Sequence, residues 1–355
     1  MIMSLKAVGR NSMKKLPNTL YVTTPEAYLA LDGENIVVLK ESDTLIRVPL
    51  HNLESIVTFG YTGASPALLG ACADRQIAIT FMTGSGRFLA SVIGEMHGNV
   101  ILRKTQYRFA DKEEECEKVA RNFLIGKLHN SRWVLERATR DHAMRVNVEK
   151  LKNVSSSLAK SIKLLQNANG VASLRGIEGD AAAQYFSAFD ELILRDKELF
   201  FFNNRSRRPP MDRVNALLSF SYSLLASDAV SALNAVGLDP FVGFLHRDRP
   251  GRRSLALDLI EELRPVFADR FVLSLINNRQ ITKNDFLFKE SGAVLMQESG
   301  RKTFLAAWQA KKNETIKHPF LDEKVEWGMV PYIQALLLSR YLRSDLDEYP
   351  PFFWK

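Results

Sequence analysis

The fold is decided by the stretch ADKEEECEKVARNFLIGKLHNSRWVLERATRDH, which covers residues 110–142. It contains no proline and one glycine, and its apolar residues recur with the period of an α-helix. Acidic residues crowd its beginning and basic residues its later turns, an order that complements the helix dipole. We predict one long helix here. We interpret its basic residues as a solvated helix face, with DNA contact as the alternative.

The chain is mostly helical from about Arg103 onward. A second helix is predicted over 148–168, because Asn169-Gly170 is a typical C-terminal cap. Two prolines directly precede the pair Met211-Asp212, and aspartate at position 212 is a favourable N-cap for a further helix.

Two other features interrupt or extend this helical pattern. The segment 285–299 predicts a β-hairpin that turns near Ser291-Gly292, with a helix that begins near Ser299. The longest uncharged apolar runs cover 214–227 and 327–339. Both are too short to span a bilayer, so we predict that they are buried core helices.

Residues 18–95 have a different character. Short runs of β-branched and aromatic residues, such as TLYVT, AYLALDG and NIVVLKES, are separated by turn signals such as Asp32-Gly33. One helix is predicted from Ser65 to Arg75, followed by a strand from Ile77 to Met82. We therefore expect an α+β protein, with a small antiparallel, sandwich-like β domain and a larger all-α domain.

The predicted domain boundaries follow from this change of character. The β-rich domain covers 13–102 and the α-helical domain covers 103–355. Residues 1–12 form an N-terminal extension to which we assign no function. The N-terminus lacks the apolar stretch that a secretory signal requires, so we expect a cytoplasmic protein.

Composition narrows the classes of function. The formal net charge is +8 and the pI is about 9.4, which favours nucleic acid as a partner, and an anionic membrane surface second. A solvated basic surface is the simpler alternative. The two cysteines have no CxxC spacing, which excludes a disulfide framework and a zinc finger. Motifs of P-loop ATPases, zincins and α/β-hydrolases are absent from the sequence.

Acidic and histidine residues in the second half of the chain suggest a chemistry. Glu178 lies in LRGIEGDAAAQYF, His246 ends FVGFLH, and Asp258 and Glu261 lie in SLALDLIEELRP. Carboxylates and a histidine in an arginine-rich chain suit a metal-dependent enzyme that acts on phosphodiesters. Each segment alone has a simpler interpretation. Asp258 and Glu261 are three residues apart and share one helix face, which from this segment alone we interpret as an acidic solvent face.

Arginines cluster at two places near these residues. Guanidinium groups fork onto phosphate oxygens, so both clusters are candidate contacts for a DNA backbone. A mobile solvated loop is the alternative for the second cluster. The candidates are Arg205, Arg207 and Arg208 in RSRRPP, and Arg247, Arg249, Arg252 and Arg253 in RDRPGRR.

Small residues and polar residues raise two further alternatives. Gly176 and Gly179 flank Glu178, and they permit close approach of either a partner helix or a substrate. Asn215 and Tyr222 are polar positions in an otherwise apolar helix. We expect them to satisfy hydrogen bonds in the core, with a place in a functional site as the alternative.

Taken together and in this order, four segments resemble one protein family. They are LRGIEGDAAAQYF, RSRRPPMDRVNALLSFSYSLL, GLDPFVGFLHRDRPGRRSLALDLIEELRP and NDFLFKESGAVLMQESGRKTFLAAW. They look like the CRISPR-associated adaptation endonuclease and integrase, the first of the Cas families. The resemblance runs from about Leu16 to the terminal PPFFWK, and the sequences of the motifs most resemble those of the I-C subtype.

The resemblance implies a set of site residues. The family's metal site of a glutamate, a histidine and a second acid falls on Glu178, His246 and Glu261, and it implies Mg²⁺ or Mn²⁺ as the cofactor. Asp258 matches a nearby acid that supports the site, and Tyr222 matches a tyrosine near it, so both are candidate catalytic residues. The implied reaction is attack of a DNA 3′-OH on a phosphodiester, which inserts short duplex DNA into the CRISPR repeat array.

The resemblance also implies partners. The family acts on double-stranded and branched DNA and forms homodimers through the β domain. Two such dimers flank a dimer of a small ferredoxin-like partner, the second Cas family, in a heterohexamer, and no membrane is involved. The alternative function is a non-catalytic DNA-binding scaffold subunit whose acids are surface charges.

Overall fold

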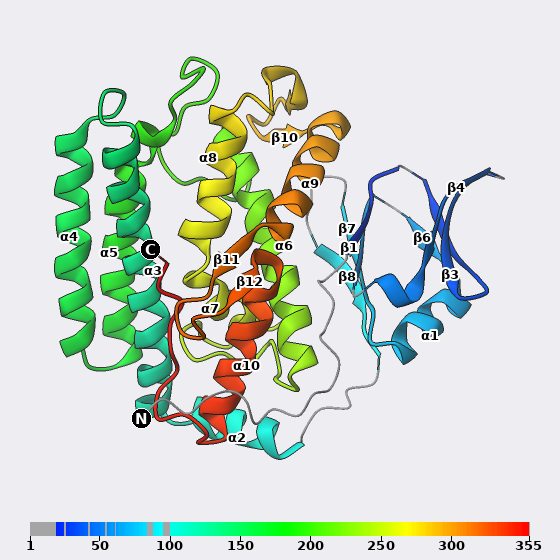
Figure 1. Ribbon diagram of the computed structural model, residues 1–355, viewed down its shortest axis with the longest axis horizontal. Coiled ribbons are helices and arrows are strands. Elements are labelled where there is room, and N and C mark those ends of the chain that lie inside the picture. Colours follow the sequence, from blue (N-terminus) through cyan, green and yellow to red (C-terminus); the bar gives the residue numbers. More distant parts are fainter. Residues whose placement is uncertain are drawn as a thin grey trace.

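The computed structural model describes residues 19–354 except for residues 25, 42, 54, 61, 84–87 and 95–99. The predicted extension over 1–12 therefore lies outside the described residues. Figure 1 shows a β-rich part at one end of the molecule and a larger helical part at the other, which confirms the predicted α+β class. The predicted boundary after residue 102 falls within the first turn of α2 (Val100–Ala110).

The β-rich part consists of two four-stranded sheets, with strand orders β4-β3-β2-β6 and β1-β5-β7-β8. The strands are β1 (Thr19–Val22), β2 (Tyr28–Asp32), β3 (Asn35–Lys40), β4 (Asp43–Pro49), β5 (Ser55–Phe59), β6 (Gly63–Ala64), β7 (Ala78–Met82) and β8 (Phe88–Val92).

The predicted antiparallel pairing is only partly right. The pairs β2/β3, β3/β4 and β7/β8 are antiparallel, but β1/β5, β2/β6 and β5/β7 are parallel. The predicted helix forms as α1 (Pro66–Asp74), whose N-cap Ser65 accepts a hydrogen bond from the Leu68 N–H. Because α1 carries the chain across between β5 and β7, these two strands run in the same direction.

Both sheets and α1 share one core, which agrees with a sandwich-like arrangement. Leu29 and Ile36 come from one sheet, Ile56 and Ile79 from the other, and all four are fully buried. Buried apolar surface of this kind is what holds two sheets together.

Nine α-helices are described in the rest of the chain. They are α2, α3 (Glu113–Asp141), α4 (Val148–Asn167), α5 (Val171–Ser187), α6 (Arg213–Ala235), α7 (Ser254–Glu261), α8 (Arg270–Asn277), α9 (Glu298–Asn313) and α10 (Val330–Leu342). The long helix predicted over 110–142 is confirmed as α3, and α4 ends just before Gly170, whose φ is +78°. Side by side in Figure 1, α3, α4 and α5 form one flank of the molecule.

The central helix α6 connects the two parts of the molecule. As predicted, Asp212 caps it, because its carboxylate accepts a hydrogen bond from the Asn215 N–H at 2.7 Å. The ring of Phe220 lies 5.6 Å from that of Phe59 in β5. Within the described residues α6 is the one helix long and apolar enough to cross a membrane, but 67% of its apolar window is buried. It is the core helix that the run 214–227 predicted.

The helical part also contains two short antiparallel β-ribbons. The predicted hairpin is confirmed as β9 (Phe286–Phe288) and β10 (Val294–Met296), with Gly292 at a φ of +79° in its turn. The second ribbon, β11 (Thr315–Lys317) with β12 (Lys324–Glu326), was not predicted, since three-residue strands carry little pattern.

Candidate functional site

A lysine joins two of the predicted site residues. Glu178 lies in the middle of α5, Glu261 ends α7, and both helices pack on α3. From α3, the ammonium of Lys127 forms an ion pair with Glu178 and lies 2.7 Å from Oε2 of Glu261. The structure thus brings together two acids from distant segments, around a cation that the sequence analysis missed.

Glu261 is buried and stays ionised. Its side chain is 4% exposed, and its Oε1 lies 2.8 Å from Nη1 of Arg264. Burial alone would raise the pKa of Glu261, but the cations of Arg264 and Lys127 leave that pKa lowered. Its Oε2 is buried as well, and its partner among the described residues is the ammonium of Lys127. The interpretation of this helix face as solvent-exposed is therefore wrong.

Asp258 is fully buried and organises the segment that carries His246. Its Oδ2 accepts hydrogen bonds from the N–H groups of Phe244 and Leu245 at 2.7 and 2.9 Å. Its Oδ1 lies 3.0 Å from the His246 N–H and 2.5 Å from His246 Nδ1. A carboxylate at Nδ1 fixes the ring and leaves Nε2 for another ligand.

Gly243 allows this wrapping. A Cβ at this position would lie 2.6 Å from Asp258 Oδ2 and 2.9 Å from the backbone carbon of Ser254. Only glycine lets the chain approach α7 so closely.

One hydrogen bond ties the His246 segment to the Glu178 helix. Nε of Arg175, one turn before Glu178 on α5, donates to the Leu245 carbonyl at 2.7 Å. All three predicted ligands therefore come from segments that converge on one region.

The three residues are not preassembled as a cluster of metal ligands. Over the described ranges, no group of three acids, histidines or cysteines lies close enough to hold a metal ion as it stands. The donor chemistry nevertheless fits a divalent ion. Two carboxylates that the Lys127 ammonium holds close together, and an imidazole whose ring is fixed through Nδ1, suit Mg²⁺ or Mn²⁺.

Tyr222 faces the same region from α6. Its hydroxyl donates to Oδ1 of Asp269 at 2.6 Å, and the guanidinium groups of Arg205 and Arg264 lie 5.4 and 5.1 Å from its ring centre. Tyr222 satisfies a buried hydrogen bond, as expected, and also lines a cavity. That cavity is lined by Lys127, Leu128, Ser131, Leu158, Glu178, Ala181, Ala182, Tyr185, Phe186, Arg207, Tyr222, Arg264, Pro265 and Asp269.

Asn215, the other polar residue of this helix, is a core residue. It is fully buried, accepts from Arg205 at 2.7 Å and donates to the Asn204 carbonyl at 2.8 Å. It therefore pins the loop before α6, as the sequence interpretation expected.

The glycines beside Glu178 leave open space. A Cβ at Gly176 or Gly179 would meet no atom within 4 Å. Tight packing against a partner helix is therefore the wrong interpretation for these glycines, because both positions are exposed.

The candidate arginines divide into two groups. Arg207, Arg208, Arg247 and Arg249 are exposed, whereas Arg205, Arg252 and Arg253 are half-buried. Within the second group, Arg205 donates to Ser219 Oγ at 3.1 Å and Arg253 stacks 3.7 Å from the ring centre of Phe88. Burial lowers the pKa of both Arg205 and Arg253. The half-buried arginines make contacts within the protein that stabilise the fold, and the exposed arginines are available to bind a polyanion.

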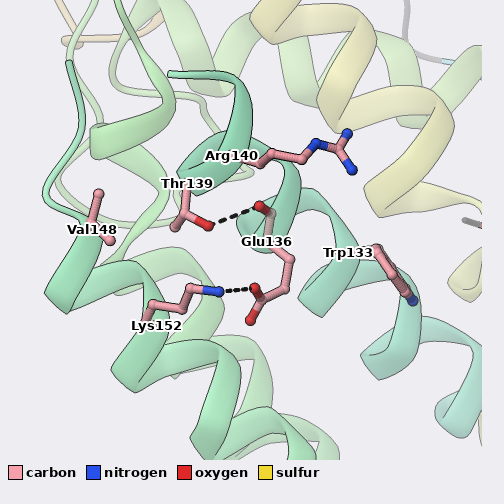
Figure 2. A pocket seen from close by; sticks show the side chains of 6 residues that line it. All are labelled: Trp133, Glu136, Thr139, Arg140, Val148 and Lys152. Atoms are coloured by element: carbon pink, nitrogen blue, oxygen red, sulfur yellow. Dashed lines mark hydrogen bonds and ion pairs between the residues drawn. The ribbon is translucent and has the colours of Figure 1, made fainter. Parts of the chain in front are cut away.

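A second hollow lies between α3 and α4, lined by Trp133, Glu136, Thr139, Arg140, Val148 and Lys152. Figure 2 shows that its acid, Glu136, points to Lys152, and the two form an ion pair. Glu136 also accepts a hydrogen bond from Ser155 at 2.6 Å. Because no predicted site residue lines it, this hollow is a poor candidate for the chemistry.

Comparison with known proteins points to one family. A family model described as CRISPR associated protein Cas1 matches residues 20–310. A CRISPR-associated endonuclease Cas1 of Chlorobaculum tepidum is 51% identical over 343 residues, which is 97% of this chain and 100% of the relative. Another from Rhodospirillum rubrum is 49% identical over 97% of this chain and 100% of the relative. The solved structure of a Cas1 protein from Thermotoga maritima superposes with a TM-score of 0.79 at 25% identity, covering 92% of this chain and 96% of that one.

Proposed function

Since this chain belongs to the Cas1 family of CRISPR-associated proteins, we propose that it is a DNA endonuclease and integrase of CRISPR adaptation. In this function it inserts short duplex DNA into the CRISPR repeat array. One observation carries the proposal: the segments of Glu178, His246 and Glu261 converge beside a cavity that Arg207 also lines. The names of its relatives as endonucleases support it.

Three side chains would hold a divalent ion. They are the carboxylates of Glu178 and Glu261 and Nε2 of His246, and the ion is Mg²⁺ or Mn²⁺. When bound, such an ion polarises the scissile phosphate and stabilises the charge on its oxygens.

The other residues prepare this site. Asp258 holds the ring of His246 with Nε2 free, and Arg264 keeps Glu261 ionised in spite of its burial. Exposed arginines, such as Arg207 and Arg247, bind the DNA backbone without reading its bases. With a DNA 3′-OH as the nucleophile the product is a joined strand, and with water the same site cleaves DNA.

The assembly follows from the family resemblance. We propose a homodimer through the β domain, where the edge strand β4 exposes Leu45 and Ile46. A small ferredoxin-like protein of the second Cas family joins two such dimers in a heterohexamer that binds double-stranded and branched DNA. We also propose that the protein is located in the prokaryotic cytoplasm. The sequences of its motifs favour the I-C subtype.

A joining assay tests this function. Purified protein and partner are incubated with a supercoiled repeat-bearing plasmid and a short duplex, with Mg²⁺ or Mn²⁺. We expect joined products that disappear with a chelator and with a fragment that lacks its 3′-OH. A protein that binds the DNA equally with and without divalent ions, and neither cleaves nor joins it, would be a scaffold subunit instead.

A further inference from the structure

A buried tyrosine–aspartate pair lies beside the proposed site. Asp269 is 1% exposed, and its two carboxylate oxygens accept hydrogen bonds from Tyr222 at 2.6 Å and from Tyr185 at 3.1 Å. All three residues line the cavity that also contains Glu178 and Lys127. The sequence analysis did not identify Asp269, and the function proposed above gives it no role.

Asp269 and Arg264 are the two ends of one irregular turn. The segment Arg264–Asp269 is π-helical, a form that recurs at functional sites because it redirects side chains within a helix. Its first residue, Arg264, forms the ion pair with Glu261, and its last residue, Asp269, accepts a hydrogen bond from the hydroxyl of Tyr222. One turn thus contacts both a candidate metal ligand and the tyrosine.

The direction of the hydrogen bond matters for the chemistry. Tyr222 uses its only hydroxyl hydrogen in the bond to Asp269, and no donor among the described residues is paired with its oxygen. The lone pairs of that oxygen can therefore accept a proton from a group in the cavity. We propose that Tyr222 and Asp269 form a proton relay for the joining reaction, with Asp269 as the final acceptor. This inference rests on the proposed function and adds two roles to it.

The proton and electron balance of the step is complete. As the DNA 3′ oxygen bonds to phosphorus, its proton moves to the oxygen of Tyr222 while the proton of Tyr222 moves to Asp269. The phosphorus–oxygen bond of the target strand breaks, and the leaving 3′ oxygen keeps the electron pair and takes a proton from water. Asp269 then returns its proton to solvent.

The surroundings of Asp269 suit a base that works near neutral pH. Among the described residues, the ionisable groups that act on its pKa are Tyr222 from α6, Tyr185 from α5, Arg205 from the loop before α6, and Arg264 from its own turn. Burial raises the pKa of Asp269 to about 6, against the opposing effects of these tyrosines and arginines. The carboxylate is therefore ionised at pH 7 but more basic than an ordinary aspartate.

The test measures joining rates for Tyr222→Phe, Asp269→Asn and the double variant. General base catalysis contributes roughly 10²–10⁴-fold, so each single variant should lose at least about a hundredfold. Residues that act as one unit are non-additive, so the double variant should fall within about threefold of the slower single variant. The acid limb of the wild-type rate near pH 6, set by Asp269, should be absent from both single variants.

A matched control has the same type of bond outside the cavity. Tyr107 donates to Asp239 at 2.9 Å on the surface, so Tyr107→Phe should join DNA at the wild-type rate. Losses that multiply in the double variant, or an acid limb kept in Tyr222→Phe, would overturn the relay.

Three further outcomes are also decisive. If Asp269→Asn unfolds below the assay temperature, Tyr222→Phe alone tests the relay. The relay predicts that this variant joins DNA more slowly and loses both the acid limb and any solvent deuterium isotope effect. Wild-type joining that Tyr222→Phe leaves unchanged would remove the relay and keep the proposed function. Wild-type protein that joins no DNA would remove both.

Discussion

At the scale of single residues, the central finding is that Lys127 lies between two acids. Its side chain is 13% exposed, and burial alone would lower its pKa, yet the carboxylates of Glu261 and Glu178 leave that pKa raised. The lysine therefore stays charged and acts as the counter-ion of two acids that would otherwise repel each other.

Replacing Lys127 tests this role. In Lys127→Met the buried carboxylates lose their cation, which we expect to lower the free energy of unfolding by about 3 kcal/mol without divalent ions. Mn²⁺ should raise the melting temperature of this variant more than that of the wild type. Lys152→Met is the control, because Lys152 pairs with Glu136 at an exposed position and should cost less than about 1 kcal/mol. Equal Mn²⁺ shifts in wild type and Lys127→Met would contradict this role.

Gly243 offers a second test at this scale. A methyl group there would collide with Asp258 and with the backbone of Ser254, so Gly243→Ala should lose about 1–3 kcal/mol of stability. Joining should fall as well, because His246 would be displaced. In α1, Gly70→Ala meets open space at an ordinary φ and should leave stability unchanged or raise it slightly. Thermal melts of both variants decide, and equal behaviour would refute the steric argument.

Sequence patterns carry some of this site but not all of it. Motifs identify Glu178, His246 and Glu261, but the same patterns place Lys127 among the solvated charges of a long helix. A signal is present, since Lys127 falls on the apolar stripe of α3 with Phe123 and Leu124. A lysine on a buried stripe requires a buried partner.

At the scale of elements, helix ends are predictable and strand directions are not. Asp212 and Ser65 mark helix starts through local backbone chemistry, and the structure confirms both. The predicted C-cap at Gly170 is wrong in its role, because Ala168 is the C-cap of α4 and Gly170 is the N-cap of α5. Parallel pairing of β5 with β7 depends on where α1 crosses, which no local pattern contains. The π-helical turn that aims Asp269 is likewise set by packing and not by residue preference.

Helix α10 contacts the residue next to Glu261 through a chain of buried polar side chains. Oε1 of Gln334 accepts a hydrogen bond from Nε2 of His318 at 3.1 Å, and the Gln334 amide nitrogen donates to Glu262 and Tyr349, both at 2.7 Å. Glu262 also accepts from the Phe352 N–H at 2.8 Å. The residue next to Glu261 thus anchors the C-terminal segment.

His318 gives this chain a dependence on pH. Burial lowers its pKa from 6.5 to about 4, so the unfolded chain binds a proton between these values and the folded chain does not. The stability that the buried, neutral His318 contributes is therefore fully present above pH 6.5, and it is lost as the pH falls toward 4. We expect denaturant unfolding of His318→Gln to show a shallower loss of stability over this window than the wild type. Equal slopes would show that His318 is not the group responsible.

At the scale of the whole molecule, the positive charge is divided by exposure. Arg247 and Arg249 are exposed in the loop after His246, whereas Arg253 stacks on Phe88 of the β domain. One end of this loop, at Arg253, therefore packs against the β domain, and the other end carries the exposed charges of Arg247 and Arg249.

This division predicts separable effects on DNA binding. In a variant with Arg247→Ala and Arg249→Ala, affinity for duplex DNA should fall, and the slope of log affinity against log salt should decrease by about 1 for each phosphate that the variant no longer neutralises. The melting temperature should stay near that of the wild type. Arg253→Ala should instead lower the melting temperature. An unchanged salt slope in the double variant would exclude this loop from the DNA interface.

The central claim is that Glu178 and Glu261 belong to one site that acts on DNA. The most direct measurement compares the rates at which wild type, Glu178→Gln, Glu261→Gln and Glu136→Gln join a duplex to a repeat-bearing plasmid in Mn²⁺. Glu136 is the matched control, since it is an ion-paired glutamate in the other hollow (Figure 2). We predict losses above about a hundredfold for the first two variants, retained DNA binding, and a wild-type rate for Glu136→Gln. Joining at the wild-type rate by Glu178→Gln or Glu261→Gln would contradict the account.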